Sequence, residues 1–265
     1  MTQEASRFVG SIPQHYDEFL GPRLFNGYAA DLAKRVVGGN PDSVLELAAG
    51  TGIVSRCLRD HLPDVCSLVV TDLNAPMLEV AQSKFQAGEN VRFETVDATV
   101  LPYEGASFDT VACQFGVMFF PDKQLSYQEA LRVLRPGGKY FFNVWGSWSE
   151  NPFAQIAHQT VAEFFPVDPP GFYKVPFGYH DTAVIEESLV SAGFARVTVQ
   201  NLGFTSPIGS AEEFGRGLVF GNPLFDEVLS RGGDPDQVCA AVTSAIAEQL
   251  GEDMPIKALV IEAEK

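Results

Sequence analysis

Short apolar runs alternate with helical patterns between residues 43 and 145. The runs that predict strands are Ser43–Leu47, Ser67–Thr71, Val91–Val96, Phe108–Gln114 and Lys139–Trp145. Helices are predicted between them, because Ala75–Ala87 and Lys123–Leu134 repeat apolar residues every three or four positions. This alternation predicts a parallel sheet that is covered by helices on both faces.

Each of the two predicted helices has an apolar face that is expected to pack on the sheet. In the first helix this face consists of Met77, Leu78, Ala81 and Phe85. In the second helix it consists of Leu125, Ala130, Leu131 and Leu134. Faces of this kind are typical of the crossover helices that connect parallel strands.

The alternation breaks after Trp145. A stretch rich in proline and aromatic residues reaches Tyr179, and a helix is predicted over Asp181–Ala192 with Gly193 as its C-cap. Two further strands are predicted, Ala195–Leu202 and Ile256–Ala263. The residues between these strands hold two helical patterns, Ala211–Phe220 and Pro235–Leu250. The connection is too long for a hairpin loop and predicts a separate small helical cap.

Composition narrows the classes of partner. The chain has 265 residues, with 18 lysines and arginines against 34 acidic residues and a formal net charge of −16. Most of such a surface repels a phosphate backbone, so neither nucleic acid nor an anionic membrane is expected as a partner. The four cysteines, Cys57, Cys66, Cys113 and Cys239, form no Cys-x-x-Cys pair. With no signal-like apolar segment near the N-terminus, a soluble cytoplasmic protein is expected.

A glycine-rich turn follows the first predicted strand. Glu46-Leu47-Ala48-Ala49-Gly50-Thr51-Gly52 leads into a helical stretch that begins near Ile53. Glycine permits positive φ and close approach of a ligand, and the free N–H groups of the helix start favour a carboxylate or a phosphate. Asp72 ends the second strand, where an acidic side chain can accept the hydroxyls of a ribose. Turn and acid together indicate a nucleoside-containing ligand, although such glycines also occur for purely structural reasons.

Two further features distinguish a nicotinamide dinucleotide from other nucleoside-containing cofactors. Asp97-Ala98 follows the third strand, where a polar side chain can meet an adenine amino group. The turn continues as Gly50-Thr51-Gly52-Ile53-Val54-Ser55 and lacks the third glycine of a dinucleotide fingerprint. A nicotinamide cofactor is therefore disfavoured.

The order of these motifs resembles that of class I S-adenosylmethionine-dependent methyltransferases. The resemblance rests on Val44–Gly52, Thr71–Leu78, Asp97-Ala98, Phe108-Asp109 and Leu134–Gly138, and it covers about Tyr16 to Trp145. The chain is most similar to the type 11 subgroup that includes the quinone-biosynthesis C-methyltransferases. Ala48 departs from the pattern, because the family often has a glycine there.

The resemblance implies an α/β fold: a Rossmann-like, doubly wound, mostly parallel seven-stranded sheet with its last strand antiparallel, plus a helical cap. Residues 1–42 would form an N-terminal helical segment over the donor site. Residues 43–203 with 255–265 would form the S-adenosyl-L-methionine-binding core, and residues 204–254 the cap inserted before the last strand. The product of the donor would be S-adenosyl-L-homocysteine.

The resemblance also implies which residues bind the donor. Those around its methionine part and ribose would be Glu46, Ala48, Gly50, Gly52 and Asp72, with Tyr16 folded over the carboxylate. Those around adenine and the sulfonium would be Leu73, Met77, Asp97, Ala98, Gln114 and Phe115. Leu73 and Met77 could equally be plain core residues, since an apolar helix face needs no ligand.

The acceptor is expected beyond the methyl group, under Met1–Phe25, Gly146–Tyr179 and Phe204–Met254. These segments are rich in aromatic residues, which indicates a small apolar or aromatic acceptor, although the rings could also be the core of the cap. If a base is needed, His15 and His180 are the candidates on segments expected to cover the site, and each could instead be structural. No histidine has a metal-ligand spacing, and no Ser-His-Asp order or nucleophile elbow supports a hydrolase.

Three functions remain open at this point. The first is a methyltransferase that transfers a methyl group to a small molecule by in-line displacement, as a monomer or a homodimer. The second is a donor-binding regulatory module without catalysis. The third is a nicotinamide-dependent oxidoreductase.

Overall fold

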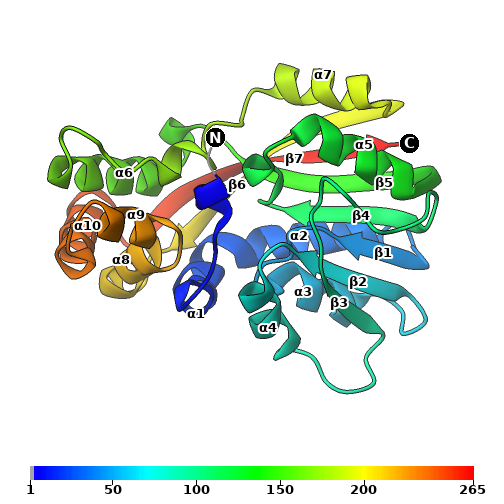
Figure 1. Ribbon diagram of the computed structural model, residues 1–265, viewed down its shortest axis with the longest axis horizontal. Coiled ribbons are helices and arrows are strands. Elements are labelled where there is room, and N and C mark those ends of the chain that lie inside the picture. The colour runs from blue at the N-terminus through cyan, green and yellow to red at the C-terminus, as the bar shows by residue number, and fades with distance from the viewer. Residues whose placement is uncertain (1–2) are drawn as a thin grey trace.

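Seven strands form a single mixed sheet. They are β1 (Ser43–Glu46), β2 (Ser67–Asp72), β3 (Val91–Thr95), β4 (Phe108–Gln114), β5 (Leu134–Trp145), β6 (Arg196–Pro207) and β7 (Asp253–Glu264). In the computed structural model, which describes residues 3–265, their order is β3-β2-β1-β4-β5-β7-β6 (Figure 1). Strands β1 to β5 pair in parallel, and β7 runs antiparallel to both β5 and β6. The predicted sheet is confirmed; Met1 and residue 2 of the predicted N-terminal segment lie outside the described residues.

Helices cover both faces of this sheet. On one face lie α2 (Asn26–Val37), α3 (Ile53–His61) and α4 (Ala75–Gln82), whose Leu32, Val54 and Leu78 pack with Val44 and Val70 of the strands. On the other face lie α5 (Lys123–Val133) and α7 (Thr182–Ala192). Alternate strand residues point to opposite faces, so each strand contributes to both layers. The predicted helix after Asp181 and its left-handed C-cap at Gly193 are confirmed.

Two details of the predicted helix faces are wrong. Helix α4 ends at Gln82 rather than continuing to Ala87. Phe85 lies beyond its end, where its ring packs edge-on against Phe93 and under the Arg56 guanidinium. In α5 the inward residues include Tyr127, whereas Leu125 is 38% exposed. The buried face of α5 consists instead of Ser126, Tyr127, Ala130 and Val133.

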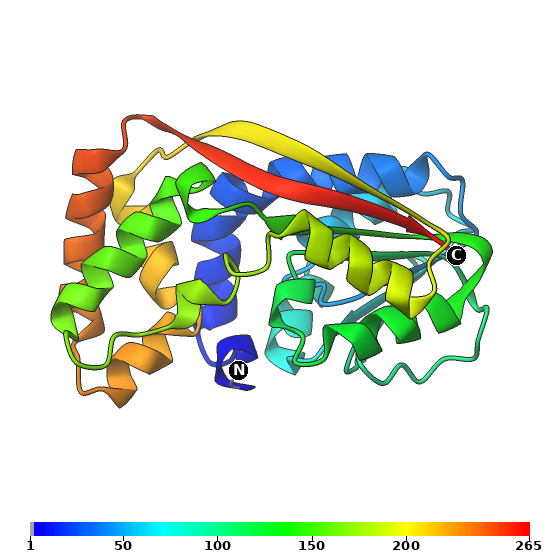
Figure 2. The same cartoon turned by 90° about the horizontal axis from the view of Figure 1, so that it is seen from above.

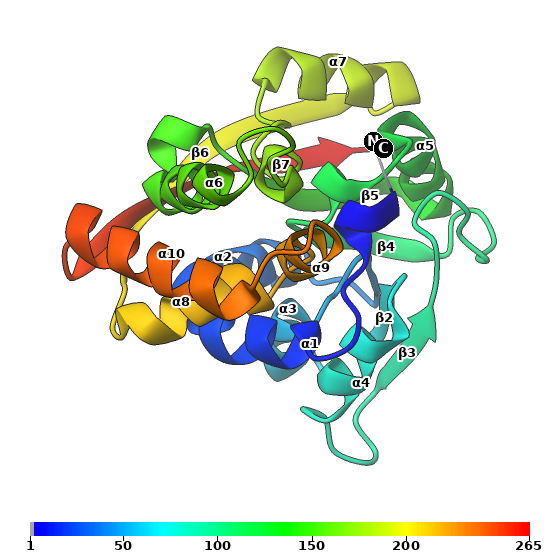
Figure 3. The same ribbon diagram turned by 60° about the vertical axis from the view of Figure 1, so that its left-hand side comes forward.

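A group of helices lies beside the sheet, beyond the carboxyl ends of the parallel strands (Figure 3). It contains α6 (Pro152–Phe164), α8 (Ala211–Phe220), α9 (Leu224–Ser230), α10 (Pro235–Gln249), α1 (Ile12–His15) and the π-helix η2 (Tyr16–Phe25). Short 3-10 turns complete it: η1 (Gln3–Ser6), η3 (Val117–Phe119), η4 (Trp148–Glu150) and η5 (Phe172–Lys174). Helix α10 packs against α8 and α6, and α8 packs against η2.

Glycines explain how closely α8 approaches its neighbours. A Cβ at Gly215 would lie 2.1 Å from the Thr243 hydroxyl in α10. A Cβ at Gly217 would lie 2.6 Å from Leu20 in η2. The two glycines therefore let α8 fit between α10 and the N-terminal π-helix, despite their low helix propensity.

Strands β6 and β7 are longer than predicted and connect the two parts. Their pairing continues from Leu202 opposite Ala258 to Pro207 opposite Asp253, whereas β5 pairs with β7 only as far as Trp145 opposite Ala258. The extra residues form a two-stranded ribbon that runs from the sheet to the helical group (Figure 2). The predicted boundaries between core and cap, after residue 203 and before residue 255, fall within this ribbon.

Candidate active site

The glycine-rich turn adopts left-handed backbone conformations. Gly50 and Gly52 have φ of 59° and 78°, and Ala48 has φ of 49° although it is not a glycine. A Cβ at Gly50 would meet the Met77 methyl at 3.3 Å, whereas one at Gly52 would meet the Ala81 Cβ at 2.7 Å. Gly50 thus opens the turn toward a ligand, and Gly52 allows the start of α3 to lie against α4.

Asp72 at the end of β2 is 6% exposed. One carboxylate oxygen accepts a hydrogen bond from Gly50 N at 2.9 Å, and the other accepts from Asn74 N at 2.7 Å. Burial raises the pKa of Asp72, although these N–H groups oppose the shift. Asn74 Nδ2 also donates to this carboxylate at 3.3 Å, so about one of its roughly four acceptor positions remains for a ligand's hydroxyl.

A large cavity opens in front of the turn, with an empty volume of about 1240 Å³ including its mouth. Ten predicted donor residues line it: Tyr16, Ala48, Gly50, Asp72, Leu73, Met77, Asp97, Ala98, Gln114 and Phe115. We call this space the donor cavity. Predicted residues Glu46 and Gly52 are absent from its wall. The sequence motifs missed Ser6, Phe8, Asn74 and Lys123, which also line it.

Glu46 lies directly behind this wall. It is 1% exposed, and its Oε2 has no hydrogen-bond partner among residues 3–265. Burial and the nearby Asp72 carboxylate raise the pKa of Glu46 to about 8, while the Ser55 hydroxyl acts in the opposite sense. An unsatisfied buried carboxyl group beside a ligand cavity is suited to a positively charged group on that ligand.

The end of β4 forms the opposite side of the donor cavity. Phe115 has φ of 51°, a strained conformation for a bulky residue, and its N–H donates to the Asn143 side chain at 2.9 Å. A Cβ at Gly116 would lie 2.5 Å from that of Ala48. The two strained turns therefore pack directly against each other. Gln114 Oε1 is buried without a hydrogen-bond partner in the described chain.

The N-terminal segment closes the donor cavity. Asn74 Nδ2 donates to the Ser6 carbonyl at 3.0 Å, and Asp17 forms an ion pair with Lys84. Tyr16 stacks on Phe25, with ring centroids 4.8 Å apart. Burial, together with Asp72 and Asp17, raises the pKa of Tyr16, so its hydroxyl stays protonated at neutral pH.

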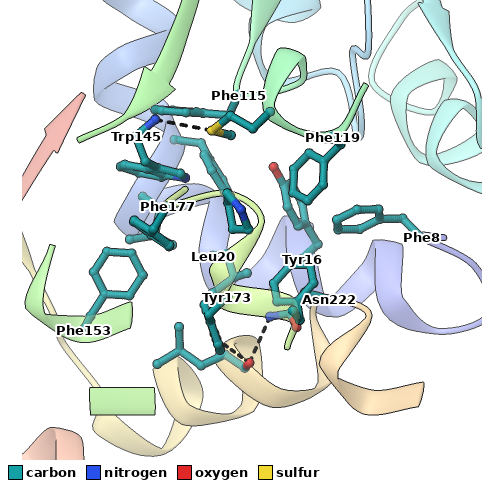
Figure 4. A pocket seen from close by; sticks show the side chains of 16 residues that line it. Phe8, Tyr16, Leu20, Phe115, Phe119, Trp145, Phe153, Tyr173, Phe177 and Asn222 are labelled. Carbon is teal, nitrogen blue, oxygen red and sulfur yellow. Dashed lines mark hydrogen bonds between the residues drawn. The ribbon is translucent and has the colours of Figure 1, made fainter. Parts of the chain in front are cut away.

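A second cavity, the acceptor cavity, adjoins the first and has an empty volume of about 500 Å³ (Figure 4). Among residues 3–265, no charged side chain lines it. Its wall consists of Phe8, Tyr16, Leu20, Leu24, Phe25, Phe115, Met118, Phe119, Trp145, Phe153, Phe172, Tyr173, Pro176, Phe177, Leu218 and Asn222. Five of these residues, Phe8, Tyr16, Phe115, Met118 and Phe119, also line the donor cavity. The two cavities thus meet at shared aromatic walls.

Neither candidate histidine lines a cavity. The ring of His15 packs against Phe19 and Phe220, and its Nδ1 lies 2.9 Å from the Ser11 carbonyl. His180 is exposed, and its Nδ1 lies 2.9 Å from the Phe177 carbonyl. The fold brings the predicted donor residues together but leaves both histidines outside.

The described residues also bear on metal binding and on membrane-spanning helices. Within residues 3–265, no three His, Cys, Asp or Glu side chains are grouped so that they could hold a metal ion. In the same part of the chain, every helix is too short or too polar to cross a bilayer.

Comparison with known proteins agrees with this geometry. Residues 44–138 match the family described as a methyltransferase domain. Over these residues the chain is similar to methyltransferase domains. The match covers the glycine-rich turn, Asp72, Asp97 and the end of β4, which are the elements that surround the donor cavity.

Curated proteins similar to this chain include the demethylmenaquinone methyltransferase of Deinococcus radiodurans. It is 36% identical over 141 residues, which are 52% of this chain and 58% of that protein. The chain spans about half the length of the curated relatives it matches.

Solved structures share the fold. The YcgJ protein of Bacillus subtilis superposes with a TM-score of 0.58 at 18% identity and covers 90% of this chain and 98% of its own. Phosphoethanolamine N-methyltransferase 2 of Haemonchus contortus gives a TM-score of 0.60 at 17% identity, with 96% of this chain and 56% of that chain covered. At these identities the likeness extends to the fold alone.

Proposed function

We propose that the protein transfers a methyl group from S-adenosyl-L-methionine to a small, uncharged apolar or aromatic molecule. The observation that carries this proposal is the junction of the two cavities at Tyr16, Phe115 and Phe119. One cavity has polar and acidic groups suited to a nucleoside and an amino acid. The other is apolar, and its volume is in the range that holds small organic molecules.

The donor cavity can be assigned group by group. Asp72 would accept a ribose hydroxyl, Asp97 and Ala98 would meet the adenine edge, and Leu73 and Met77 would cover its faces. Glu46 behind the turn would attract the ammonium of the methionine part, with Gly50 and Gln114 nearby. Such a ligand would fit two observations. The buried oxygens of Glu46 and Gln114 lack hydrogen-bond partners among residues 3–265, and Gly50 leaves open the space that a Cβ would fill.

When bound, S-adenosyl-L-methionine supplies an electrophilic methyl group on a sulfonium. The residues of this chain contribute alignment and exclusion of water, which can provide much of the rate of a displacement in which charge is lost. Phe115, Tyr16 and Phe119 would hold the acceptor atom in line. With His15 and His180 away from both cavities, we propose that no histidine acts as a base.

Several broader expectations accompany this proposal. The helices between β6 and β7 would act as a cap that shapes the acceptor cavity, with residues 43–203 and 255–265 as the core. The net charge of −16 supports a small-molecule acceptor rather than nucleic acid. Four unpaired cysteines are consistent with the reducing cytoplasm. The protein would act as a monomer or a homodimer.

The test combines donor binding with turnover. Replacing Asp72 by alanine removes a charge-assisted hydrogen bond to ribose and the carboxylate that holds the Gly50 N–H, so calorimetry should show S-adenosyl-L-homocysteine affinity weakened by about 1.5 to 3 kcal/mol. Asp60→Ala, a change on an exposed part of α3, serves as the matched control. The wild type should transfer labelled methyl to members of a panel of uncharged aromatic acceptors.

Three results would count against the proposal. An unchanged affinity of Asp72→Ala for S-adenosyl-L-homocysteine would contradict the assignment of the donor cavity. Tight donor binding without turnover over the whole panel would favour a regulatory module. A change in the fluorescence of a reduced nicotinamide cofactor when it is mixed with the protein would favour an oxidoreductase.

A further inference from the structure

The acceptor cavity has two chemically different ends (Figure 4). Phe115 and Tyr16 belong also to the donor cavity, so the reacting atom of an acceptor is expected near them. Tyr173 and Asn222 line the acceptor cavity only, and Figure 4 shows them well separated from Phe115. The cavity therefore has a reactive end and a remote end.

The remote end carries a small group of hydrogen-bonding atoms, which we call the polar corner: Tyr173, Asn222 and the Leu218 carbonyl. The Tyr173 hydroxyl donates to this carbonyl at 2.7 Å, and Asn222 Nδ2 donates to it at 2.9 Å. Asn222 Oδ1 accepts from Leu224 N at 3.0 Å, which fixes the orientation of the amide. Asn222 is 3% exposed, so the corner is an internal feature of the cavity.

Hydrogen-bonding capacity remains in the polar corner after these bonds. A primary amide has two N–H donors: Asn222 uses one for Leu218, and its side chain also bonds the Tyr173 hydroxyl, a bond that a ligand oxygen would replace. A tyrosine hydroxyl can accept as well as donate, so the oxygen of Tyr173 is a further acceptor. The corner can thus recognise a carbonyl through the second Asn222 N–H, or a hydroxyl through both residues.

The remaining walls suit a flat, uncharged body. Trp145 and Phe177 stack with ring centroids 5.7 Å apart, and Phe119 and Phe172 stack at 6.2 Å. Figure 4 shows Trp145 and Phe177 on one side of the cavity and Phe119 on the other. Without a charged side chain in the wall, an ionised substituent would be buried without a counter-ion at a large cost.

We propose that the acceptor is an uncharged aromatic molecule with a neutral carbonyl or hydroxyl group remote from the methylated atom, and that Asn222 and Tyr173 recognise this group. This inference rests on the proposed function, since it assumes that the donor occupies its cavity. Asn222 and Tyr173 are specificity-determining residues in this account, because they lie away from the reacting atoms.

The test uses three para-substituted toluenes of matched shape, which have no hydroxyl of their own for the polar corner to bind: the acetyl, isopropyl and carboxylate compounds. Each is titrated at neutral pH into the full chain saturated with S-adenosyl-L-homocysteine. The acetyl compound should bind about tenfold more tightly than the isopropyl compound, the effect of one buried hydrogen bond, and the carboxylate should bind most weakly.

Two variants test the residues themselves. Asn222→Ala removes the amide donor and should reduce the acetyl preference to about twofold or less, and an intact S-adenosyl-L-homocysteine affinity shows that this variant folds. Tyr173→Phe keeps the ring and removes an oxygen whose proton is already donated to Leu218, so it should keep the acetyl preference within about twofold of the wild type. Tyr103→Phe, which removes a hydroxyl bonded to Glu94 away from both cavities, should leave the preference unchanged.

Equal affinity for the acetyl and isopropyl compounds would overturn the inference. Preferential binding of the carboxylate, no binding of any compound, or an unchanged acetyl preference in Asn222→Ala would overturn it equally. S-adenosyl-L-homocysteine affinity is measured first in every protein. Its absence in the wild type would refute the proposed function, whereas intact donor binding without discrimination would refute only the role of the polar corner.

Discussion

At the scale of single residues, the donor cavity depends on groups in costly states. Glu46 is a buried carboxyl without a hydrogen-bond partner for Oε2 among residues 3–265, and Ala48 and Phe115 adopt left-handed backbone conformations. Such features persist where the surrounding fold holds them in place, and they concentrate at functional sites. Here all three lie in or directly behind the donor cavity wall.

Glu46 should make stability depend on pH. Its pKa is raised from 4.5 to about 8 in the folded protein, so the folded state holds a proton that the unfolded state has lost. The resulting stabilisation is complete below about pH 4.5 and is lost as the pH rises toward 8. Over this window the unfolding free energy of the wild type should fall relative to that of Glu46→Gln. Denaturant titrations of both proteins would measure the difference, and parallel curves would contradict the shift.

Gly52 should matter for packing more than for conformation alone. Gly52→Ala places a Cβ 2.7 Å from that of Ala81 at φ of 78°, whereas Gly137→Ala has a similar φ of 76° and nothing within 4 Å. Both variants carry the backbone strain, but only the first carries the clash. Gly52→Ala should therefore be less stable than Gly137→Ala by about 1 to 3 kcal/mol in chemical unfolding. Equal losses of unfolding free energy in the two variants would show that the structure relaxes around the new Cβ at no cost.

At the scale of elements, a buried arginine joins α3 to the start of β2. Arg59 is 6% exposed and donates to the carbonyls of Cys66 at 2.8 Å, Leu62 at 2.9 Å and Asn90 at 3.1 Å, as well as to Pro63. Three of these carbonyls accept a second hydrogen bond: Cys66 O from Asn90 Nδ2 at 3.1 Å, Pro63 O from Cys66 N at 2.9 Å and Asn90 O from Leu68 N at 3.4 Å. One side chain thus ties together three segments at the amino ends of the strands.

Replacing Arg59 by methionine keeps much of the volume but removes the charged donor that these carbonyls share. The variant should lose about 3 kcal/mol of unfolding free energy, because four hydrogen bonds to a charged group are lost. Arg56→Met on the same helix removes the partly exposed ion pairs with Asp60 and Glu89, and should lose about 1 kcal/mol or less. S-adenosyl-L-homocysteine affinity should stay unchanged in Arg59→Met, and a large fall in it would show that the donor cavity depends on this end of the sheet.

At the scale of the whole molecule, the β6–β7 ribbon and the N-terminal segment connect the sheet to the helical group. Arg23 in η2 donates to the Ile208 carbonyl at 2.7 Å and pairs with Glu213 of α8 at 2.6 Å. The same segment reaches the donor cavity through the Ser6–Asn74 bond and the Asp17–Lys84 ion pair. The N-terminal segment therefore contacts both parts of the molecule.

Donor binding should stabilise this segment. S-adenosyl-L-homocysteine would lie against Tyr16, so amide exchange over residues 5–25 should slow when it binds, while exchange in β4 should change little. Hydrogen exchange with mass spectrometry would measure both regions, with α7 as a reference on the far face. Exchange over residues 5–25 that is already as slow as in β4 without ligand would show a fixed wall rather than a closing segment.

Local patterns in the sequence determined where the strands lie and which residues follow them. The glycine-rich turn, Asp72, Asp97 and Phe115 could be predicted as neighbours, because the carboxyl ends of parallel strands meet at one edge of a sheet. Tertiary packing decided what no local pattern carries: that Phe85 leaves α4, that β6 and β7 extend into a ribbon, and that His15 and His180 lie outside both cavities. Asn222 and Tyr173 come together only because α8 packs against η2 and η5 reaches α8, contacts between segments far apart in the chain whose geometry depends on side-chain shape rather than on periodicity.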